Sequence, residues 1–225
     1  EGTKGDVRKL DNKIERPYQR LIRYTKFETV SMEGTGKSPS TPSQTVFAEA
    51  LADELRAIGV KDVFVDENGY VYGTIPSNVP DWHGSTLALI AHMDVASASP
   101  CVNVRPRVVD YDGGDVELGN GVTLKGSDFP ELRKCAGKHI IVTDGSTLLG
   151  ADDKAGIAEI MTMAEMLLKD PSIPRGDVKI CFTPDEEIGT GIRHIDLNLL
   201  AADFAYTLDG GDVAEIVYET FSADK

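Results

Sequence analysis

The 225-residue sequence predicts an α/β fold with a largely parallel sheet. Continuous apolar runs at 86–91 and 178–183 are typical of strands that are covered on both faces. They alternate with amphipathic helical patterns at 43–58 and 157–168, as expected of strands joined by crossover helices. The length suffices for one substantial core or two smaller ones.

The composition limits the classes of partner. Lys and Arg number 23 against 37 Asp and Glu, and the formal charge of −14 disfavours nucleic acid and anionic membranes. No apolar run approaches the ~20 residues of a membrane span, and no signal-peptide pattern is present. Cys101, Cys135 and Cys181 form no CxxC pair, which favours reduced thiols in a cytoplasmic protein.

The first expected element is a helix within residues 11–26, where apolar residues recur at helical spacing. Pro17 interrupts this pattern and favours a start nearer Glu15. A loop is expected over residues 31–43, which are rich in Gly, Ser and Pro.

The next helix is expected to be capped by Ser43 and to end at Gly59, with Val46 among its buried residues. Strands at 62–65 and 70–75 should then form a hairpin, because Asn-Gly lies between them.

The remaining elements each end in a polar motif. The strand at 86–91 leads into His-Met-Asp, and an irregular stretch from about 97 to 140 suggests one or two small hairpins. A helix follows Asp152 and is closed by Asp-Pro at 170–171. The strand at 178–183 leads into Pro-Asp-Glu-Glu, and a last strand at 204–208 leads into Asp-Gly-Gly.

These motifs are expected to converge in space. The carboxyl ends of parallel strands lie along one edge of an α/β sheet, where ligands bind. This edge would collect one histidine and several carboxylates, which is a suitable ligand set for zinc. Each motif alone has a simpler explanation: a helix cap at Asp152, a solvated Glu-Glu pair, a structural His or a turn at Asp-Gly-Gly. A single site explains all four together.

The spacing suggests roles within such a site. His92 and Asp94 are two residues apart and point to the same side of an extended chain, so Asp94 is able to orient the imidazole. Glu186 and Glu187 are adjacent and point to different sides, so one could bind metal while the other acts as general base.

The motifs together resemble those of the M20 metallopeptidases, and most closely the tripeptide aminopeptidases of that family. They are Ala-His-Met-Asp at 91–94, Leu-Leu-Gly-Ala-Asp-Asp-Lys-Ala-Gly at 148–156, Phe-Thr-Pro-Asp-Glu-Glu-Ile-Gly at 182–189 and Tyr-Thr-Leu-Asp-Gly-Gly at 206–211. The resemblance begins at about Ile14 and implies a three-layer zinc-exopeptidase catalytic domain with a largely parallel mixed sheet.

The resemblance also implies two zinc ions and a role for each motif. By this resemblance His92 and Asp209 would bind one zinc, Glu187 would bind the second, and Asp152 would bridge both. Asp94 would orient His92, and Glu186 would be the general base. Members of the family often have a cis peptide bond after the bridging aspartate.

The sequence departs from the family in length. Members carry a lid domain after the Asp-Gly-Gly strand, pair as dimers through it, and then return to the catalytic domain with a second His ligand. We therefore expect residues 1–215 to be a C-terminally incomplete catalytic domain and 216–225 the beginning of the lid. The other histidines, His83, His139 and His194, match no ligand position, so the second zinc would lack a ligand and the isolated chain should be inactive.

The expected function is zinc-dependent release of the N-terminal residue from tripeptides, with a small peptide as substrate. Other M20 activities, a dipeptidase or an N-acyl amino acid deacylase, remain alternatives, as does a non-catalytic metal-binding module. A magnesium phosphatase fits less well, because it would explain neither His92 nor the Glu-Glu pair.

Overall fold

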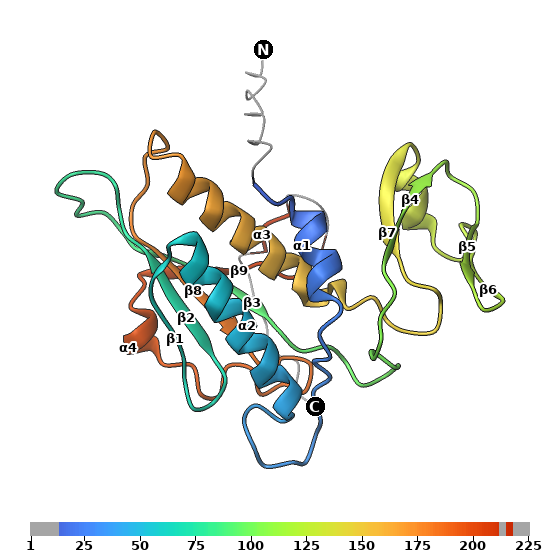
Figure 1. Ribbon diagram of the computed structural model, residues 1–225, viewed down its shortest axis with the longest axis horizontal. Coiled ribbons are helices and arrows are strands. Elements are labelled where there is room, and N and C mark those ends of the chain that lie inside the picture. Colours follow the sequence, from blue (N-terminus) through green and yellow to red (C-terminus); the bar gives the residue numbers. More distant parts are fainter. Residues whose placement is uncertain (1–13, 212–214, 218–225) are drawn as a thin grey trace.

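The computed structural model describes residues 14–211 and 215–217, and its centre is a five-stranded mixed sheet (Figure 1). The strands, in spatial order, are β1 (Lys61–Val65), β2 (Val71–Ile75), β8 (Val178–Thr183), β3 (Leu87–His92) and β9 (Phe204–Thr207). Strand β3 runs parallel to both β8 and β9, whereas β2 is antiparallel to β1 and β8. The predicted α/β class, largely parallel sheet and β1–β2 hairpin are therefore confirmed.

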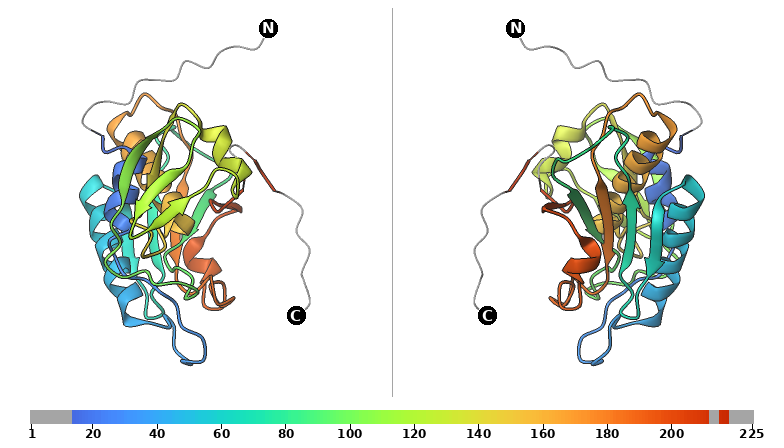
Figure 2. Two further views of the ribbon diagram at one scale, coloured as in Figure 1. Left: turned by 90° about the vertical axis from the view of Figure 1, so that its right-hand side faces the viewer. Right: turned by 90° about the vertical axis from the view of Figure 1, so that its left-hand side faces the viewer.

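Three helices cover one face of this sheet (Figure 2). They are α1 (Pro17–Tyr24), α2 (Pro42–Ile58) and α3 (Ala151–Lys169). Helix α2 packs on β1 and β2, α3 packs on β3, and α1 lies against α3. Their apolar stripes meet the sheet in the main core, where Phe47, Leu51, Ile157, Ile160 and Phe182 are fully buried. This burial anchors the first turn of α3 over the end of β3.

The opposite face of the sheet holds a smaller aromatic cluster. Tyr70, which precedes β2, and Tyr72 of β2 pack with Cys181 of β8 and with Leu200 of the short helix α4 (Leu197–Leu200). Cys181 is a free and fully buried thiol in this cluster.

The segment after β3 forms a separate hairpin unit beside the sheet (Figure 1). Strand β4 (Arg107–Tyr111) pairs with β7 (Lys138–Val142), and β5 (Val116–Gly119) pairs with β6 (Val122–Leu124). A 3-10 helix, η1 (Pro130–Cys135), lies between β6 and β7. The predicted irregular stretch with small hairpins is confirmed. Its β4–β7 pair joins residues about thirty positions apart.

The helix starts differ from the predictions. Helix α1 begins at Pro17 itself, because proline is well suited to the first helical position, where its missing N–H is not needed. Helix α2 begins at Pro42 for the same reason, so the N-cap residue is Thr41 and Ser43 lies inside the helix.

Two further predictions for these helices have different outcomes. Val46 is 63% exposed and not buried, because it falls outside the stripe formed by Phe47 and Leu51. Gly59 ends α2 in the left-handed conformation, as predicted. Residues 11–13, part of the first predicted helix, lie outside the described residues. No helix in the described ranges has the length and hydropathy of a membrane span.

Candidate metal centre

The polar motifs that follow β3, β8 and β9 meet at one edge of the sheet, because these three strands run in the same direction. Nε2 of His92 lies 3.0 Å from a carboxylate oxygen of Asp152, at the beginning of α3. The same nitrogen lies 3.8 Å from Glu186 and 3.9 Å from Asp209. Three distant parts of the sequence thus surround one imidazole.

The orientation of His92 is fixed by the residue two positions later. His92 is 2% exposed, and its Nδ1 lies 3.0 Å from the backbone oxygen of Asp94 and 3.4 Å from a carboxylate oxygen of Asp94. A carbonyl oxygen only accepts hydrogen bonds, so Nδ1 carries the proton that is donated here. This leaves Nε2 directed at the carboxylates, the arrangement that a metal-binding histidine requires.

The Asp94 carboxylate has a second task that its spacing from His92 did not reveal. It is fully buried, and its two oxygens accept the backbone N–H groups of Glu186, at 2.9 Å, and Glu187, at 3.1 Å. Asp94 therefore holds the Glu-Glu turn against the end of β3, with the Glu186 side chain about half exposed.

The two adjacent aspartates at the start of α3, Asp152 and Asp153, have different roles: one caps the helix and the other faces His92. Asp153 is buried; it accepts the N–H of Gly156 at 3.1 Å, as an N-cap does, and the N–H of His92 at 3.1 Å. The backbone of Asp152 and Asp153 is not helical, so the regular part of α3 follows Asp153, and the cap considered for Asp152 belongs to Asp153. Asp152 keeps a side chain that is 69% exposed and faces His92. The peptide bond between the two aspartates is cis.

A glycine in the first turn of α3 permits the close approach of the segment that carries Asp209. A Cβ at Gly156 would lie 2.1 Å from the backbone oxygen of Leu208. Because real Cβ atoms do not come this close, any other residue would push this segment and Asp209 away from α3. The sequence pattern predicted neither this contact nor its importance for the site.

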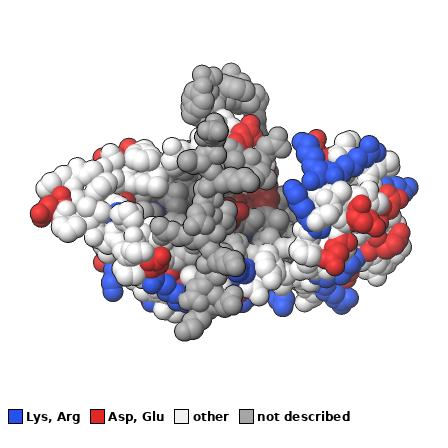
Figure 3. Space-filling model, turned by 90° about the horizontal axis from the view of Figure 1, so that it is seen from above, with Lys and Arg blue, Asp and Glu red and all other residues white. Residues whose placement is uncertain are grey.

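The electrostatics of the cluster favour a bound cation. Burial lowers the pKa of His92, but the carboxylates of Asp94, Asp153 and Asp209 outweigh it and raise that pKa to about 10. Burial raises the pKa of Asp153 to about 8, and burial together with neighbouring carboxylates raises the pKa values of Glu186, Glu187 and Asp209. Acidic side chains are also visible in the recess between the sheet and the hairpin unit (Figure 3). Carboxylates crowded in this way resist ionisation until a cation compensates them.

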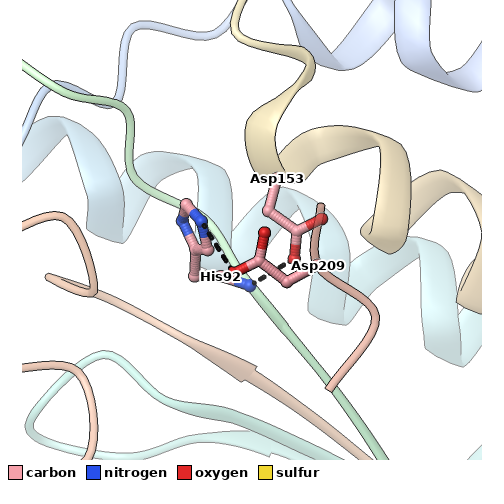
Figure 4. A group of neighbouring side chains, drawn as sticks. All are labelled: His92, Asp153 and Asp209. Carbon is pink, nitrogen blue, oxygen red and sulfur yellow. Dashed lines mark hydrogen bonds and ion pairs between the residues drawn. The ribbon is translucent and has the colours of Figure 1, made fainter. Parts of the chain in front are cut away.

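Among the described residues, two groups of side chains have the composition and spacing to hold a metal ion, and both include His92. One joins His92 to Asp152 and Glu187; the other joins it to Asp153 and Asp209 (Figure 4). Within each group the ligand atoms all lie within 4.8 Å of one another. The chemistry of these donors suits zinc, which binds imidazole nitrogen and carboxylate oxygen.

Asp153 is the member of these groups that the sequence analysis did not select. Both of its oxygens already accept backbone N–H groups, which favours a structural task for it. His83, His139 and His194 are exposed, and in the described part of the chain none of them joins a metal-competent group.

Comparison with known proteins supports this fold and finds relatives that carry the name Peptidase T. No protein-family model matches the sequence. Proteins named Peptidase T are 49% identical to it, over 91% of this chain in Halothermothrix orenii, 92% in Clostridium botulinum and 93% in Clostridium perfringens. The chain spans about half the length of these curated relatives, between 50% and 52%.

Solved structures show the same fold. A tripeptidase from Staphylococcus aureus matches with a TM-score of 0.62 and 24% identity, over 88% of this chain and 44% of that one. The aminopeptidase PepT from Bacillus cereus matches with a TM-score of 0.63 and 22% identity, over the same shares. The expected exopeptidase-like architecture is therefore confirmed.

Proposed function

We propose, from the homology of this chain to Peptidase T, that it carries the zinc-binding and acid–base groups of a tripeptide aminopeptidase. The observation that carries the proposal is the arrangement of Asp152, Glu186 and Asp209 around Nε2 of His92. Sequence identity alone does not give this arrangement. In this proposal residues 1–215 belong to the catalytic domain, and 216–225 begin a lid through which two copies would pair. The site of action would be the cytoplasm.

The ligands would be distributed over two ions. His92 and Asp209 would hold one, Glu187 would hold the other, and Asp152, whose side chain is 69% exposed, would bind both. When bound, such ions polarise a peptide carbonyl and lower the pKa of water. The described histidines supply only His92 to this arrangement, so we propose that the isolated chain is inactive.

Glu186 has the properties of the proton carrier. Its backbone is fixed by Asp94, its side chain is about half exposed, and burial together with Asp209 raises its pKa. A raised pKa lets a carboxylate accept a proton from attacking water and return it to the leaving amine. Asp94 would act through others, by orienting His92 and by holding the Glu186–Glu187 turn.

The first test is the zinc stoichiometry of the chain after equilibration and desalting, compared with Asp152→Ala and Glu186→Gln variants. The chain is expected to retain zinc, Asp152→Ala to lose it, and Glu186→Gln to retain it, because Glu186 is not assigned as a ligand. No zinc in the folded wild-type chain would contradict the ligand assignment.

The second test concerns catalysis. Residues of this chain would replace the matching segment of a curated Peptidase T relative, with that relative as control. The chimera is expected to hydrolyse tripeptides faster than dipeptides or N-acyl amino acids, and Glu186→Gln in it should lower kcat at least ~100-fold. Equal rates for the three substrate classes would favour another hydrolase activity. Unchanged kcat in Glu186→Gln would favour a non-catalytic metal-binding module.

A further inference from the structure

A hollow of about 590 Å³ lies next to the segment that follows the Glu186–Glu187 turn. One wall is the segment 32–38, which precedes α2, and the other is the segment 188–194, which follows Glu187. The volume suits a small ligand. Its polar and charged lining residues include Thr35, Lys37, Ser38, Thr190, Arg193 and His194.

The second wall is packed directly on the candidate site. A Cβ at Gly191 would lie 2.9 Å from Cα of Glu186, so this segment folds back against the backbone of the proposed base. Tyr70, the residue before β2, holds this wall in place, because its hydroxyl donates to the Gly191 carbonyl at 3.0 Å and accepts the N–H of His194 at 3.3 Å.

The first wall is tied to the same turn by a buried polar network. The carboxylate of Asp185 accepts the N–H of Ser40 at 2.8 Å and the side-chain amide of Gln44 at 2.7 Å. The oxygen of that amide accepts the N–H of Asp185 at 3.1 Å. Asp185 is only 2% exposed, so both walls of the hollow and the Glu186–Glu187 turn form one connected unit.

The charge of the hollow is opposite to that of the chain. The chain has a formal charge of −14, yet Lys37 and Arg193 both line this space. Within the described residues, neither side chain has an ion pair or a hydrogen bond, whereas Arg20, Arg23 and Arg56 are all paired with carboxylates. Unpaired Arg and Lys side chains at one concave surface are suited to an anion, and Arg binds a carboxylate with two parallel hydrogen bonds.

We propose that this hollow binds the C-terminal carboxylate of a short peptide whose N-terminal residue lies at the His92–Glu186 cluster. This inference rests on the proposed function, and it assigns selection for peptide length to Lys37 and Arg193. In an extended peptide each residue spans ~3.3–3.6 Å, so the carboxylate of a tripeptide lies roughly 7 Å beyond that of its first residue. With Lys37 and Arg193 holding that carboxylate, the site would favour tripeptides over longer peptides.

The test is an NMR titration of the 225-residue chain in the presence of a chelator, so that zinc cannot bind the peptide carboxylate. The probes are triglycine, triglycine with a C-terminal amide, and inorganic phosphate. Triglycine is expected to bind at least tenfold more tightly than its amide and to shift resonances of residues 188–194. Arg193→Met should remove this difference, and Lys37→Met should reduce it. Arg133→Met, at an exposed position on η1, is the matched control and should leave it unchanged.

Three results would overturn the inference: equal affinity for the peptide and its amide, an effect of Arg133→Met equal to that of Arg193→Met, or tighter binding of phosphate than of triglycine. These results are independent of catalysis. A hydrolytic chimera without carboxylate preference would refute the hollow's role alone. A preference in the chain without hydrolysis by the chimera would refute the proposed function and leave a peptide-carboxylate site.

Discussion

The division of labour between Asp152 and Asp153 leads to a sharp prediction about stability. Asp153→Ala removes the acceptor of the Gly156 N–H, a cap worth about 1 kcal/mol. It also leaves the buried N–H of His92 without an acceptor, at a cost of about 1–3 kcal/mol. We therefore expect the free energy of unfolding to fall by about 2–4 kcal/mol. Asp152→Ala should change it by no more than about 0.5 kcal/mol, because that side chain is 69% exposed.

The measurement is urea unfolding of all variants at one pH with a chelator present, so that bound metal does not contribute to the stability of any of them. With a slope of about 2 kcal/mol/M, the midpoint of Asp153→Ala should fall by about 1–2 M. Asp153→Asn keeps one acceptor oxygen, so its urea midpoint should lie between those of wild type and Asp153→Ala. If Asp152→Ala proves the more destabilising of the two alanine variants, the assignment of cap and ligand is wrong.

The same variants separate stability from metal binding. Asp152→Ala should lower zinc affinity by at least ~10-fold while its metal-free unfolding curve stays close to that of wild type. Competition with a chelating dye measures the affinity. Wild-type zinc affinity in Asp152→Ala would exclude Asp152 as a ligand.

Three further predictions concern the surroundings of the site. Arg20→Met should lower the free energy of unfolding by about 3 kcal/mol, because Arg20 is 2% exposed and its loss leaves buried carboxylates uncompensated. Arg23 has a side chain that is 44% exposed, so Arg23→Met should lower the free energy of unfolding by at most about 1 kcal/mol. Thermal unfolding of both variants measures the difference. Burial opposes the charge of Glu54, but hydrogen bonds from Arg23 and Arg20 hold its pKa below the ordinary value. The contribution of Glu54 to stability is therefore complete above about pH 4.5 and is lost as the pH falls through its lower folded pKa. The urea midpoint of Glu54→Gln should consequently change less than that of wild type between about pH 5 and about pH 3. Gly156→Ala should lower Tm although alanine normally favours a helix by about 1 kcal/mol, because its Cβ would clash with the Leu208 carbonyl; a higher Tm would contradict that close approach.

Local patterns were sufficient for most elements of the fold. Continuous apolar runs identified β3 and β8, Asn-Gly identified the β1–β2 hairpin, and Gly59 identified the end of α2. These signals depend on short-range preferences, which survive in the folded chain. Helix starts were less certain, because a proline disfavoured inside a helix is favoured at its first position, as Pro17 and Pro42 show.

The sequence by itself determined which residue types end the parallel strands, and therefore which side chains were candidates for a metal site. The tertiary structure decided what each of them does. Whether Asp152 or Asp153 caps α3 depends on the backbone conformation between them, and the dual role of Asp94 depends on how β3 lies beside the Glu186 turn. These contacts join residues up to 92 or 93 positions apart, and no local preference encodes which of several chemically equivalent carboxylates will be buried.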